Sequence, residues 1–535
     1  MSQGNPFSEI SFTNRLTRDL PADPNPQNHI RRVEGAAYSW VKPSPVANPK
    51  LIALIPELLE EIGLAREAHA HPDLLQVLAG NLVPSGMTPY AGCYGGHQFG
   101  SWAGQLGDGR AINLGEVRSR AGEHLTIQLK GAGKTPYSRS ADGRAVLRSS
   151  LREFVASEAM HHLGIPTTRA MSLVMTGERV IRDMFYDGNP KAEPGAITSR
   201  IAPSFTRFGH FELPAARQDV ELLRKLVDFS ISCEFEACDL PSDQDGYAAW
   251  FLEIAKRTAH LIAEWQRVGF VHGVMNTDNL SIIGLTIDYG PFGWLDHFDP
   301  DWTPNTTDAE TRRYTYAAQP EVGRWNLIRL ANAIYPLVGS ATPLEKAIEA
   351  YDACFIRNWD LALSRKLGIS IDSRNGDDQR FIKALWDLLG RKETDFTLFF
   401  RGLSRWPEDP STETLSTIPL FFKEAWYDQQ SVGNTLEARI LAWSMEYQAR
   451  IHQDGRTPDI RNKERLEANP RFVLRNYLAH DTSNQVEAGN VEAITILLDT
   501  LKKPYDDQPG RDDYAKLRPE WARNRAGCSM LSCSS

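Results

Sequence analysis

The chain has 535 residues, of which 41% are hydrophobic and 24% are charged, and its formal net charge at pH 7 is −9. These values are typical of a globular protein with one large or two ordinary domains. The negative charge argues against a general nucleic-acid-binding protein, which needs a basic surface. The sequence has no apolar run long enough to cross a bilayer, and its N-terminus lacks the apolar core of a secretion signal. We therefore expect a cytoplasmic protein.

The first part of the chain predicts an extended arm, a helix and then strands. Residues 1–50 are rich in Pro and Asn, which favours the arm, and residues 51–63 have apolar residues at helical spacing. The next expected elements are a segment dense in glycine and aromatic residues at 84–110, strands at 111–116 and 124–130, a helix at 144–163, and a strand-rich stretch at 168–203.

The second part of the chain, from residue 219 onward, predicts mostly helices. A helix over 247–268 leads directly into the segment HGVMNTDN. Strands with one helix, followed by many helices, predict an α+β protein. Its small β-rich lobe would hold a nucleotide, and its large lobe would be mainly helical. Further amphipathic helices are expected near 323–337, 344–366, 378–390 and 433–453.

The segment HGVMNTDN (272–279), followed by DYG (288–290), matches most of the catalytic loop of a protein kinase. That loop reads H-R-D-x-x-x-x-N and precedes D-F-G, whose Asp binds magnesium. His272, Asn279 and Asp288 fall on matching positions, but Val274 stands where the catalytic Asp belongs. A valine side chain neither accepts a proton nor orients a hydroxyl. Asp278 is the nearest carboxylate that can replace the missing base.

Lys130 and Glu153 are placed like the phosphate-binding lysine of a kinase and its helical partner. Lys130 ends a predicted strand, and Glu153 lies on the helix that follows. An ordinary surface pair is the alternative. Asp142 and Gly143 are expected to open the same helix, either as a phosphate-facing N-terminus or with Asp142 as its N-cap.

The segment GQLGDGR (104–110) predicts a second phosphate-binding element. Gly104, Gly107 and Gly109 have the spacing G-x-x-G-x-G, the reverse of the kinase pattern. Glycines let backbone N–H groups approach a phosphate, and Arg110 adds positive charge. The alternative is a β-hairpin with an Asp-Gly turn, and both can hold together.

Two arginines and three oxygen-bearing side chains complete the candidate site. Arg200 and Arg207 flank IAPSFT and are candidates to bind phosphate, because a guanidinium binds phosphate oxygens in pairs. Surface charges are the alternative for both arginines. Asp278, Asn279 and Asp288 supply the hard oxygen ligands that magnesium prefers.

Six cysteines in a chain of this length do not form a disulfide scaffold. Cys528 and Cys533 lie in the tail GCSMLSCSS, which is too short and polar to be core. Exposed thiols on such a tail suit redox chemistry, and a frayed, inert end is the alternative. Buried, reduced thiols are expected for the four scattered cysteines, Cys93, Cys233, Cys238 and Cys354.

Long segments of the chain resemble the selenoprotein O family, also called the YdiU family. The resemblance extends from roughly residue 5 to the end, including the tail CSS. It implies a protein kinase-like fold that binds ATP in a flipped orientation. It also implies transfer of AMP, with release of pyrophosphate, to Ser, Thr or Tyr hydroxyls of other proteins. The matching segments are GGHQFGSWAGQLGDGRAINLGE, LKGAGKTPYSRSADGRAVLRSSLREFVASEAMHHLGIPTTRA, FGHFE and LIAEWQRVGFVHGVMNTDNLSIIGLTIDYGPFGWLD.

The resemblance also implies a role for single residues of this sequence. Asp278 would accept the proton, Asn279 and Asp288 would hold Mg²⁺ or Mn²⁺, and Glu153 would pair with Lys130. The residues implied to bind ATP are Gly107, Gly109, Arg110, Lys130, Asp142, Gly143, Arg200, Arg207 and Asp288.

The family tail is associated with redox chemistry, and selenocysteine stands at the position of Cys533 in some members. In some members the tail forms a disulfide with a cysteine of the large lobe. The segment FDPDWTPNTTD, after DYG, has no cysteine, so Cys528 is the other candidate partner. Eukaryotic relatives are mitochondrial, which is the alternative to the cytoplasm.

Several expectations follow for organisation and activity. The expected partners are ATP and protein acceptors, with no nucleic acid and no membrane. Three alternatives to AMP transfer stay open: transfer of the γ-phosphate with Asp278 as the base, transfer of another nucleotide such as UMP, and a non-catalytic nucleotide-binding pseudokinase.

The expected divisions are an N-terminal extension that packs on the core (1–80), a kinase-like N-lobe (81–215), a helical C-lobe with the catalytic and metal-binding loops (216–510), and a C-terminal tail (511–535).

Overall fold

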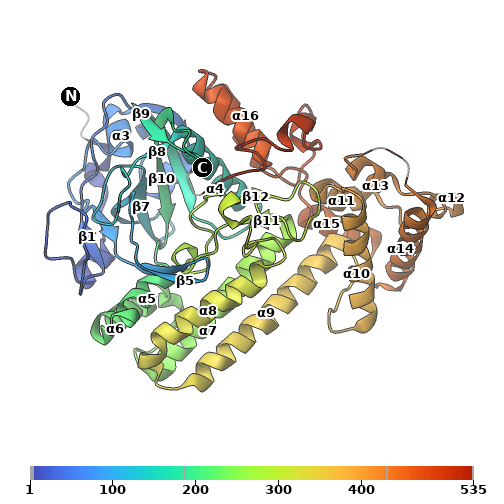
Figure 1. The fold of residues 1–535 in the computed structure, drawn as a ribbon, viewed down its shortest axis with the longest axis horizontal. Helices are drawn as coiled ribbons and strands as arrows, with labels where there is room; N and C mark the ends of the chain where they lie inside the picture. Colours follow the sequence, from blue (N-terminus) through green and yellow to red (C-terminus); the bar gives the residue numbers. More distant parts are fainter. Residues whose placement is uncertain (1–4, 186, 429, 431, 533–535) are drawn as a thin grey trace.

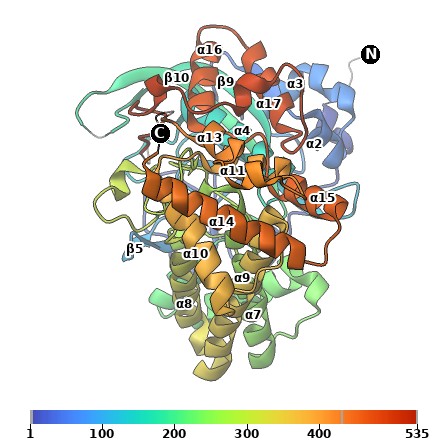
Figure 2. The same ribbon diagram turned by 90° about the vertical axis from the view of Figure 1, so that its right-hand side faces the viewer.

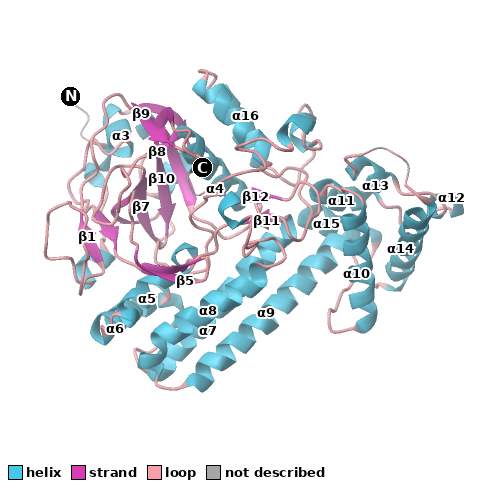
Figure 3. Ribbon diagram, in the orientation of Figure 1, coloured by secondary structure: helices cyan, strands magenta, loops and turns pink. Residues whose placement is uncertain are grey.

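A computed structural model describes residues 5–185, 187–428, 430 and 432–532 of the chain. A lobe built on a β-sheet lies beside a larger lobe made mainly of helices (Figures 1 and 3). The predicted α+β class and the bilobal, protein kinase-like arrangement are confirmed.

An antiparallel sheet of eight strands forms the small lobe: β1 (Tyr38–Trp40), β2 (Lys50–Leu54), β3 (Tyr90–Gly92), β6 (Ala111–Arg118), β7 (His124–Lys130), β8 (Ala145–Val146), β9 (Arg169–Arg182) and β10 (Lys191–Ala202). The strand order is β1-β3-β6-β7-β10-β9-β2, and β8 pairs with β10. Lys130 faces Ala111 of β6 on one side and Thr198 of β10 on the other. The lysine therefore sits at the end of a central strand, where its backbone is held on both sides.

The segment 51–63 differs from the predicted helix. Its first residues belong to β2, which pairs with β9 at the edge of the sheet, and the helix α2 (Pro56–Glu61) begins only at Pro56. Pairing with β9 satisfies backbone groups that a short helix would leave open. A proline fits the first turn of a helix, where its missing N–H is not needed.

Helix α4 (Leu147–His162), which carries Glu153, packs on β9 and β10. The sequence predicted one buried face for this helix, but even its charged residues Arg152 and Glu158 are buried. The cause lies at the far end of the chain, because α16 (Asn476–Glu487) and α17 (Glu492–Leu501) pack on α4 (Figure 2). This return of the chain to the small lobe was not expected from the sequence.

Three long helices, α7 (Gln244–Val268), α8 (Gln319–Val338) and α9 (Ala341–Leu367), lie side by side in the large lobe (Figure 1). No helix among the described residues has the length and apolar composition needed to span a membrane. The remaining α-helices among the described residues are α1 (Arg15–Asp19), α3 (Pro72–Leu78), α5 (Phe208–Ala216), α6 (Val220–Phe229), α10 (Gly376–Arg391), α11 (Phe396–Gly402), α12 (Thr412–Leu415), α13 (Leu420–Ala425), α14 (Asn434–Gln453) and α15 (Pro458–Ala468).

The segment that contains HGVMNTDN and DYG starts where α7 ends. Gly269 adopts a left-handed conformation (φ 73°) and caps that helix. Strand β11 (Phe270–Val271) follows and pairs with β12 (Gly293–Trp294). Both motifs therefore lie in one loop whose two ends are tied together.

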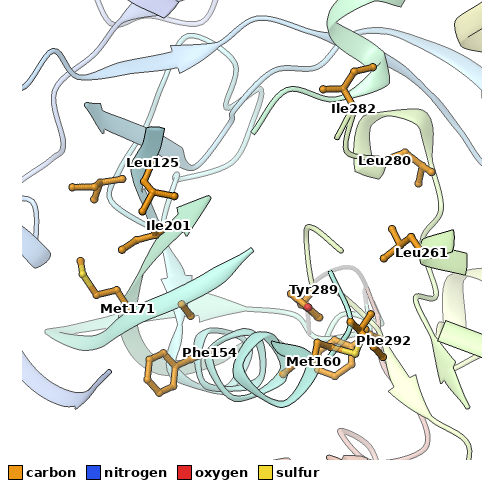
Figure 4. Close-up of a cluster of buried hydrophobic side chains, with 14 of the residues drawn as sticks. Leu125, Phe154, Met160, Met171, Ile201, Leu261, Leu280, Ile282, Tyr289 and Phe292 are labelled. Atoms are coloured by element: carbon orange, nitrogen blue, oxygen red, sulfur yellow. The ribbon is translucent and has the colours of Figure 1, made fainter. Parts of the chain in front are cut away.

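One hydrophobic core joins this loop to the sheet (Figure 4). Leu125 of β7, Phe154 and Met160 of α4, and Tyr289 and Phe292 from the DYG segment are all buried in it. Shared burial fixes the position of Asp288, the neighbour of Tyr289, relative to Lys130 and Glu153 on the other side of the site.

Candidate active site

Lys130 and Glu153 form an ion pair at the centre of the site. The Lys130 Nζ atom lies 2.7 Å from Oε2 of Glu153, and both side chains are largely buried. Burial lowers the pKa of Lys130 and is partly opposed by Glu153. The structure thus brings together the two residues that the sequence paired, and it places them inside the protein, unlike the surface-pair alternative.

The Asp288 carboxylate contacts three positively charged side chains. Its Oδ1 atom lies 3.0 Å from Nη1 of Arg200 and 3.6 Å from Nζ of Lys130, and its Oδ2 atom accepts a hydrogen bond from Arg207. Burial alone would raise the pKa of Asp288, but the three cations outweigh it and hold that pKa far below its usual value. Asp288 also has a positive φ of 58°, an uncommon conformation for a residue other than glycine. Asp288 is therefore an ionised carboxylate in a constrained position.

Arg200 and Arg207 are buried, unlike the surface charges considered as the alternative. Arg200 donates to Glu153 at 2.7 Å and to Oε1 of Gln128 at 3.0 Å. Arg207 donates to the backbone oxygen of Asp278 at 3.0 Å, and its Nε atom is buried without a hydrogen-bond partner. Both guanidinium groups are thus held inside the protein by carboxylates, and an anionic ligand that reaches them must compete with Glu153 and Asp288.

The segment HGVMNTDN is held by hydrogen bonds from its outer residues. His272 donates from Nε2 to the backbone oxygen of Ile287 at 2.9 Å, and burial lowers its pKa, which favours the neutral ring. Asn279 donates from Nδ2 to the backbone oxygen of Val274 at 3.0 Å. Val274 is buried. His272 thus helps to fix the conformation of the loop.

Asp278 has the properties of a general base. Its side chain is buried, and its Oδ2 atom accepts a hydrogen bond from Gln98 at 3.2 Å. Its Oδ1 atom is buried and has no hydrogen-bond partner among the described residues. Burial raises the pKa of Asp278 to about 6, while Gln98 and Arg207 oppose the rise and Asp288 adds to it. A carboxylate with a pKa near neutrality and a free oxygen is suited to accept a proton.

The glycines of GQLGDGR do not form the expected hairpin. The hairpin in this region is formed by β4 (Gly95–Gln98) and β5 (Ser101–Gln105), so Gly104 lies in its second strand, and residues 106–110 connect β5 to β6. Gly107 (φ 85°) and Gly109 make room for Tyr137, because a Cβ atom at Gly109 would lie 3.0 Å from the backbone oxygen of Tyr137. The predicted hairpin with an Asp-Gly turn was wrong because residues 106–110 connect two strands, β5 and β6, that belong to different sheets and do not pair with each other.

Among the residues that the structure describes, none forms an ion pair with the guanidinium of Arg110. Its backbone oxygen accepts from Gly131 at 2.8 Å, which places it beside the end of β7. Its guanidinium makes no hydrogen bond or ion pair with any residue that the structure describes, whereas Lys130 has two acidic neighbours. Arg110 is thus available to an anionic ligand, as its predicted role requires.

Asp142 and Gly143 do not open the helix that carries Glu153. The helix begins at Leu147, because Ala145–Val146 is still extended and pairs with β10. The Asp142 carboxylate pairs with Arg182 at 2.7 Å and accepts from the backbone N–H of Arg144 at 2.9 Å. Gly143 (φ 72°) lies against the backbone of Gly133, an approach that a side chain would prevent. Their expected place at a phosphate-facing helix N-terminus is therefore wrong, and a role in nucleotide binding stays a prediction.

Three residues of the site were missed in the sequence. Gln98 contacts Asp278, Gln128 holds Arg200, and the Asp108 Oδ1 atom lies 3.6 Å from Nη2 of Arg207. Asp108 stands between two glycines, a pattern that fits a turn as well as a site. Gln98 and Gln128 lie in strands. Nothing in the local sequence pattern indicates that their side chains contact residues that are distant in the sequence.

The oxygen donors of the loop fit a divalent cation such as Mg²⁺ or Mn²⁺. Asn279 uses its amide nitrogen on Val274, which leaves its Oδ1 atom for another partner, and Oδ1 of Asp278 has none. The described residues contain no group of three or more His, Cys, Asp or Glu side chains suited to a metal. Magnesium sites of nucleotide enzymes often combine one or two carboxylates with phosphate oxygens and water. The residues present therefore suit a metal that arrives with a nucleotide.

The C-terminal tail packs on the loop that follows DYG. The N–H of Thr306 donates to the backbone oxygen of Leu531 at 2.7 Å, and Leu531 donates to the backbone oxygen of Pro304 at 3.0 Å. Cys528 is buried in the core, and burial raises the pKa of its thiol to about 11. The expectation of an exposed thiol is wrong for Cys528, because this packing covers it. Cys533 lies outside the described residues, and the redox role stays a prediction.

The chain matches known proteins over most of its length. Residues 25–502 match the family model described as protein adenylyltransferase SelO. The chain belongs to the SelO family. Proteins named protein nucleotidyltransferase YdiU are similar to it: that of Rhodopirellula baltica is 52% identical over 98% of this chain and 99% of its own length, and that of Aromatoleum aromaticum is 52% identical over 99% of this chain and 100% of its own. The predicted resemblance is confirmed, and membership of this family makes the chain a nucleotidyltransferase.

A match among solved structures is much looser. It is to ROP2 from Toxoplasma gondii, described as a virulence factor with a protein-kinase fold and no enzymatic activity. That protein is 12% identical to the chain, the match covers 56% of this chain and 86% of that one, and the TM-score is 0.24. At this TM-score the superposition adds nothing to the fold described above.

Proposed function

We propose that the chain transfers AMP from ATP to Ser, Thr or Tyr hydroxyls of other proteins and releases pyrophosphate. The observation that carries the proposal is the state of Asp278, a buried carboxylate with a free oxygen, one residue before Asn279 in a loop whose usual base position is Val274. The family description as a protein adenylyltransferase supports the choice of AMP. The kinase alternative, with Asp278 as its base, is disfavoured because Val274 replaces the usual catalytic Asp and because Gly104, Gly107 and Gly109 have the reverse of the kinase spacing.

In the proposed reaction the acceptor oxygen forms a bond to the α-phosphorus of ATP. The bond from that phosphorus to the oxygen shared with the β-phosphate breaks, and its electron pair leaves with pyrophosphate. The hydroxyl proton passes to Asp278. Lys130, Arg200 and Arg207 stabilise the negative charge of the triphosphate. The triphosphate competes for these three cations with the carboxylates of Glu153 and Asp288.

A divalent ion held by Asn279 and Asp288 would supply further neutralisation of the phosphates. Arg110, which has no acidic partner among the described residues, is free to bind a phosphate as well. In the flipped orientation the γ-phosphate is the buried end of the nucleotide, and the buried cations Arg200 and Arg207 suit that end.

Labelled ATP distinguishes the proposal from its alternatives. The purified protein is incubated with acceptor proteins, Mg²⁺ or Mn²⁺, and either ATP labelled at the α- or the γ-phosphate or UTP labelled at the α-phosphate. Covalent label is expected from α-labelled ATP only. Label from γ-labelled ATP would make the chain a kinase, preferential label from α-labelled UTP would make it a UMP transferase, and retained ATP binding without any label would favour the non-catalytic alternative.

The proposed base predicts a pH dependence. Because burial raises the pKa of Asp278 to about 6, the carboxylate is protonated and inactive below that pH and ionised above it. The value of kcat/KM is therefore expected to fall by about tenfold per pH unit below about pH 6 and to level off above pH 7. ATP affinity measured over the same range is the control. A rate that stays constant between pH 5 and 7 would contradict the role of Asp278.

A further inference from the structure

The β4–β5 hairpin lies where the small lobe meets α5 and α8 (Figure 1). Its turn is anchored on the catalytic loop, because the backbone N–H of Phe99 donates to Oδ1 of Asn276 at 3.1 Å and to the hydroxyl of Tyr314 at 3.0 Å. The Tyr314 hydroxyl in turn donates to Oδ1 of Asn276 at 2.6 Å. Asn276 is two residues before Asp278, so the surface next to Tyr314 lies beside the proposed base.

Two arginines on this surface share one tryptophan. Arg313 directly precedes Tyr314, and its guanidinium lies 4.5 Å from the ring centre of Trp325. The guanidinium of Arg329 lies over the same ring at 4.9 Å. Trp325 and Arg329 are four residues apart on α8 and therefore share one face of that helix. We call Arg313, Trp325 and Arg329 the arginine patch.

The charges of the arginine patch are not neutralised by the part of the chain that the structure describes. Neither arginine has an ion pair there, and Nε and Nη2 of Arg313 and Nε of Arg329 have no hydrogen-bond partner there. Two neighbouring carboxylates are already engaged, because Asp308 accepts from the backbone N–H of Arg313 at 3.0 Å and Glu212 pairs with His97 at 2.6 Å. A bound anion would satisfy the unpaired guanidinium N–H groups.

The arginine patch is accessible and held in place by rings. Arg313, Trp325 and Arg329 are all half-buried. His97 lies 5.5 Å from Trp325 and 5.1 Å from Trp102, which is 39% exposed, so the rings form a continuous surface next to the arginines. Stacking on an indole fixes a guanidinium but does not neutralise it, and its N–H groups remain for hydrogen bonds.

The chemistry of the arginine patch favours carboxylates on a protein. A guanidinium binds the two oxygens of a carboxylate with paired N–H donors. Two arginines in a chain of net charge −9 do not form the basic surface that a nucleic acid requires. A surface beside the proposed base is also where an acceptor protein has to be held.

We propose that the acceptor protein docks an acidic segment on the arginine patch, with carboxylates of its Asp or Glu side chains on Arg313 and Arg329. The contact requires no rearrangement of the β4–β5 hairpin. It lies outside the reacting groups and selects which acceptors bind. This inference rests on the proposed function and defines its substrate class as proteins with an acidic segment near the modified hydroxyl.

Peptide binding to the wild-type protein is the first test. Two fluorescent peptides carry one Tyr between blocks of Glu or, in the matched peptide, blocks of Gln. Fluorescence anisotropy is measured with Mg²⁺ and an ATP analogue that has a methylene bridge between its α- and β-phosphorus, so that the phosphate-binding cations are occupied. The Glu peptide is expected to bind about tenfold more tightly at low salt, the effect of one charge-assisted hydrogen bond, and to lose this advantage at high salt. Equal binding of the two peptides would overturn the inference.

Removal of charge from the arginine patch separates docking from chemistry. Arg313→Gln/Arg329→Gln is expected to raise the KM for the Glu peptide about tenfold, with kcat and the KM for ATP unchanged. Arg324→Gln is the matched control, because it removes the same charge from α8 at a residue that pairs with Asp352 at 3.1 Å. This control is expected to behave like the wild type. A lower kcat with an unchanged peptide KM, or an equal effect of Arg324→Gln, would contradict docking on the patch.

Photo-cross-linking locates the docked peptide without any substitution in the protein. A Glu peptide with a photoreactive group beside its Glu block is expected to attach to the segments around Arg313 and Arg329. Excess unlabelled Glu peptide is expected to prevent the attachment, and the Gln peptide is not. Attachment to other segments only would overturn the inference. A phosphoserine peptide of equal charge that binds about a hundredfold more tightly would assign the patch to phosphorylated acceptors instead of carboxylates.

Failure of the proposed function and failure of the docking site give different results. Binding of the Glu peptide that depends on Arg313 and Arg329, without any label from α-labelled ATP, would overturn AMP transfer and leave the docking surface standing. Label from α-labelled ATP on acceptor proteins, without any preference for the Glu peptide, would support AMP transfer and overturn the docking surface.

Discussion

Replacing Asp278 with asparagine is expected to lower the rate of AMP transfer by about 10²- to 10⁴-fold, the usual contribution of a general base. Asparagine has the same shape and can still accept a hydrogen bond from Gln98, but its amide cannot take the acceptor proton. ATP binding is expected to stay nearly intact, because the cations placed to hold the phosphates are Lys130, Arg200 and Arg207. The measurements are single-turnover labelling with α-labelled ATP and a binding titration with ATP.

A matched control separates the loss of the base from the loss of a charge. Asp301→Asn changes the net charge equally at an exposed position and is expected to have the wild-type rate. The slow rate of Asp278→Asn should no longer depend on pH around 6. Labelling by Asp278→Asn at the wild-type rate would exclude Asp278 as the base.

Replacing Glu153 with glutamine is expected to destabilise the fold by about 3–5 kcal/mol, because it removes one partner of buried ion pairs. Glu153 contacts Lys130 at 2.7 Å and Arg200 at 2.7 Å, and neither cation can move into water while the lobes stay packed. AMP transfer is expected to be lost at temperatures where the variant still folds, because Lys130 is no longer positioned. Urea unfolding monitored by circular dichroism gives the change in the free energy of unfolding.

A double-mutant cycle shows whether the pair is the cause of this loss. Lys130→Met in the same chain removes one of the two cations that lose Glu153 as a partner. The double variant Lys130→Met/Glu153→Gln is therefore expected to be more stable than Glu153→Gln alone. Additive losses would mean that Glu153 stabilises the fold independently of Lys130. Glu193→Gln, which breaks the partly exposed pair with Arg148, is expected to cost about 1 kcal/mol or less.

Local sequence patterns predicted most elements because their signals lie within a few residues. The alternation of apolar residues in 124–130 predicted β7, and the segment 247–268 predicted the helix α7. The segment 51–63 failed because its first residues pair with β9, more than a hundred residues away. The helical spacing of apolar residues within 51–63 contains no information about a pairing strand so far away in the sequence.

The same distinction applies to the candidate site. The types and spacing of His272, Asn279 and Asp288 predicted a nucleotide-binding loop, and Val274 predicted that the usual base is missing. The burial that raises the pKa of Asp278 could not be predicted, since it comes from Gly96 and Gln98 in a separate hairpin. The position of Asp142 was predicted wrongly because the strand β8 lies between this residue and the start of the helix. A strand of two residues is too short to give a recognisable sequence pattern.

The sequence by itself determined the fold class, the family and the chemical types of the residues that meet at the site. Only the tertiary structure decided which charged side chains form ion pairs, which do not, and which carboxylate oxygen of Asp278 is buried. Arg110, Arg313 and Arg207 are all arginines in the sequence, yet Arg207 is bound to Asp288 while Arg110 and Arg313 have no acidic partner among the described residues. Charge pairing and desolvation depend on distances between segments far apart in the chain, and those distances are set by packing.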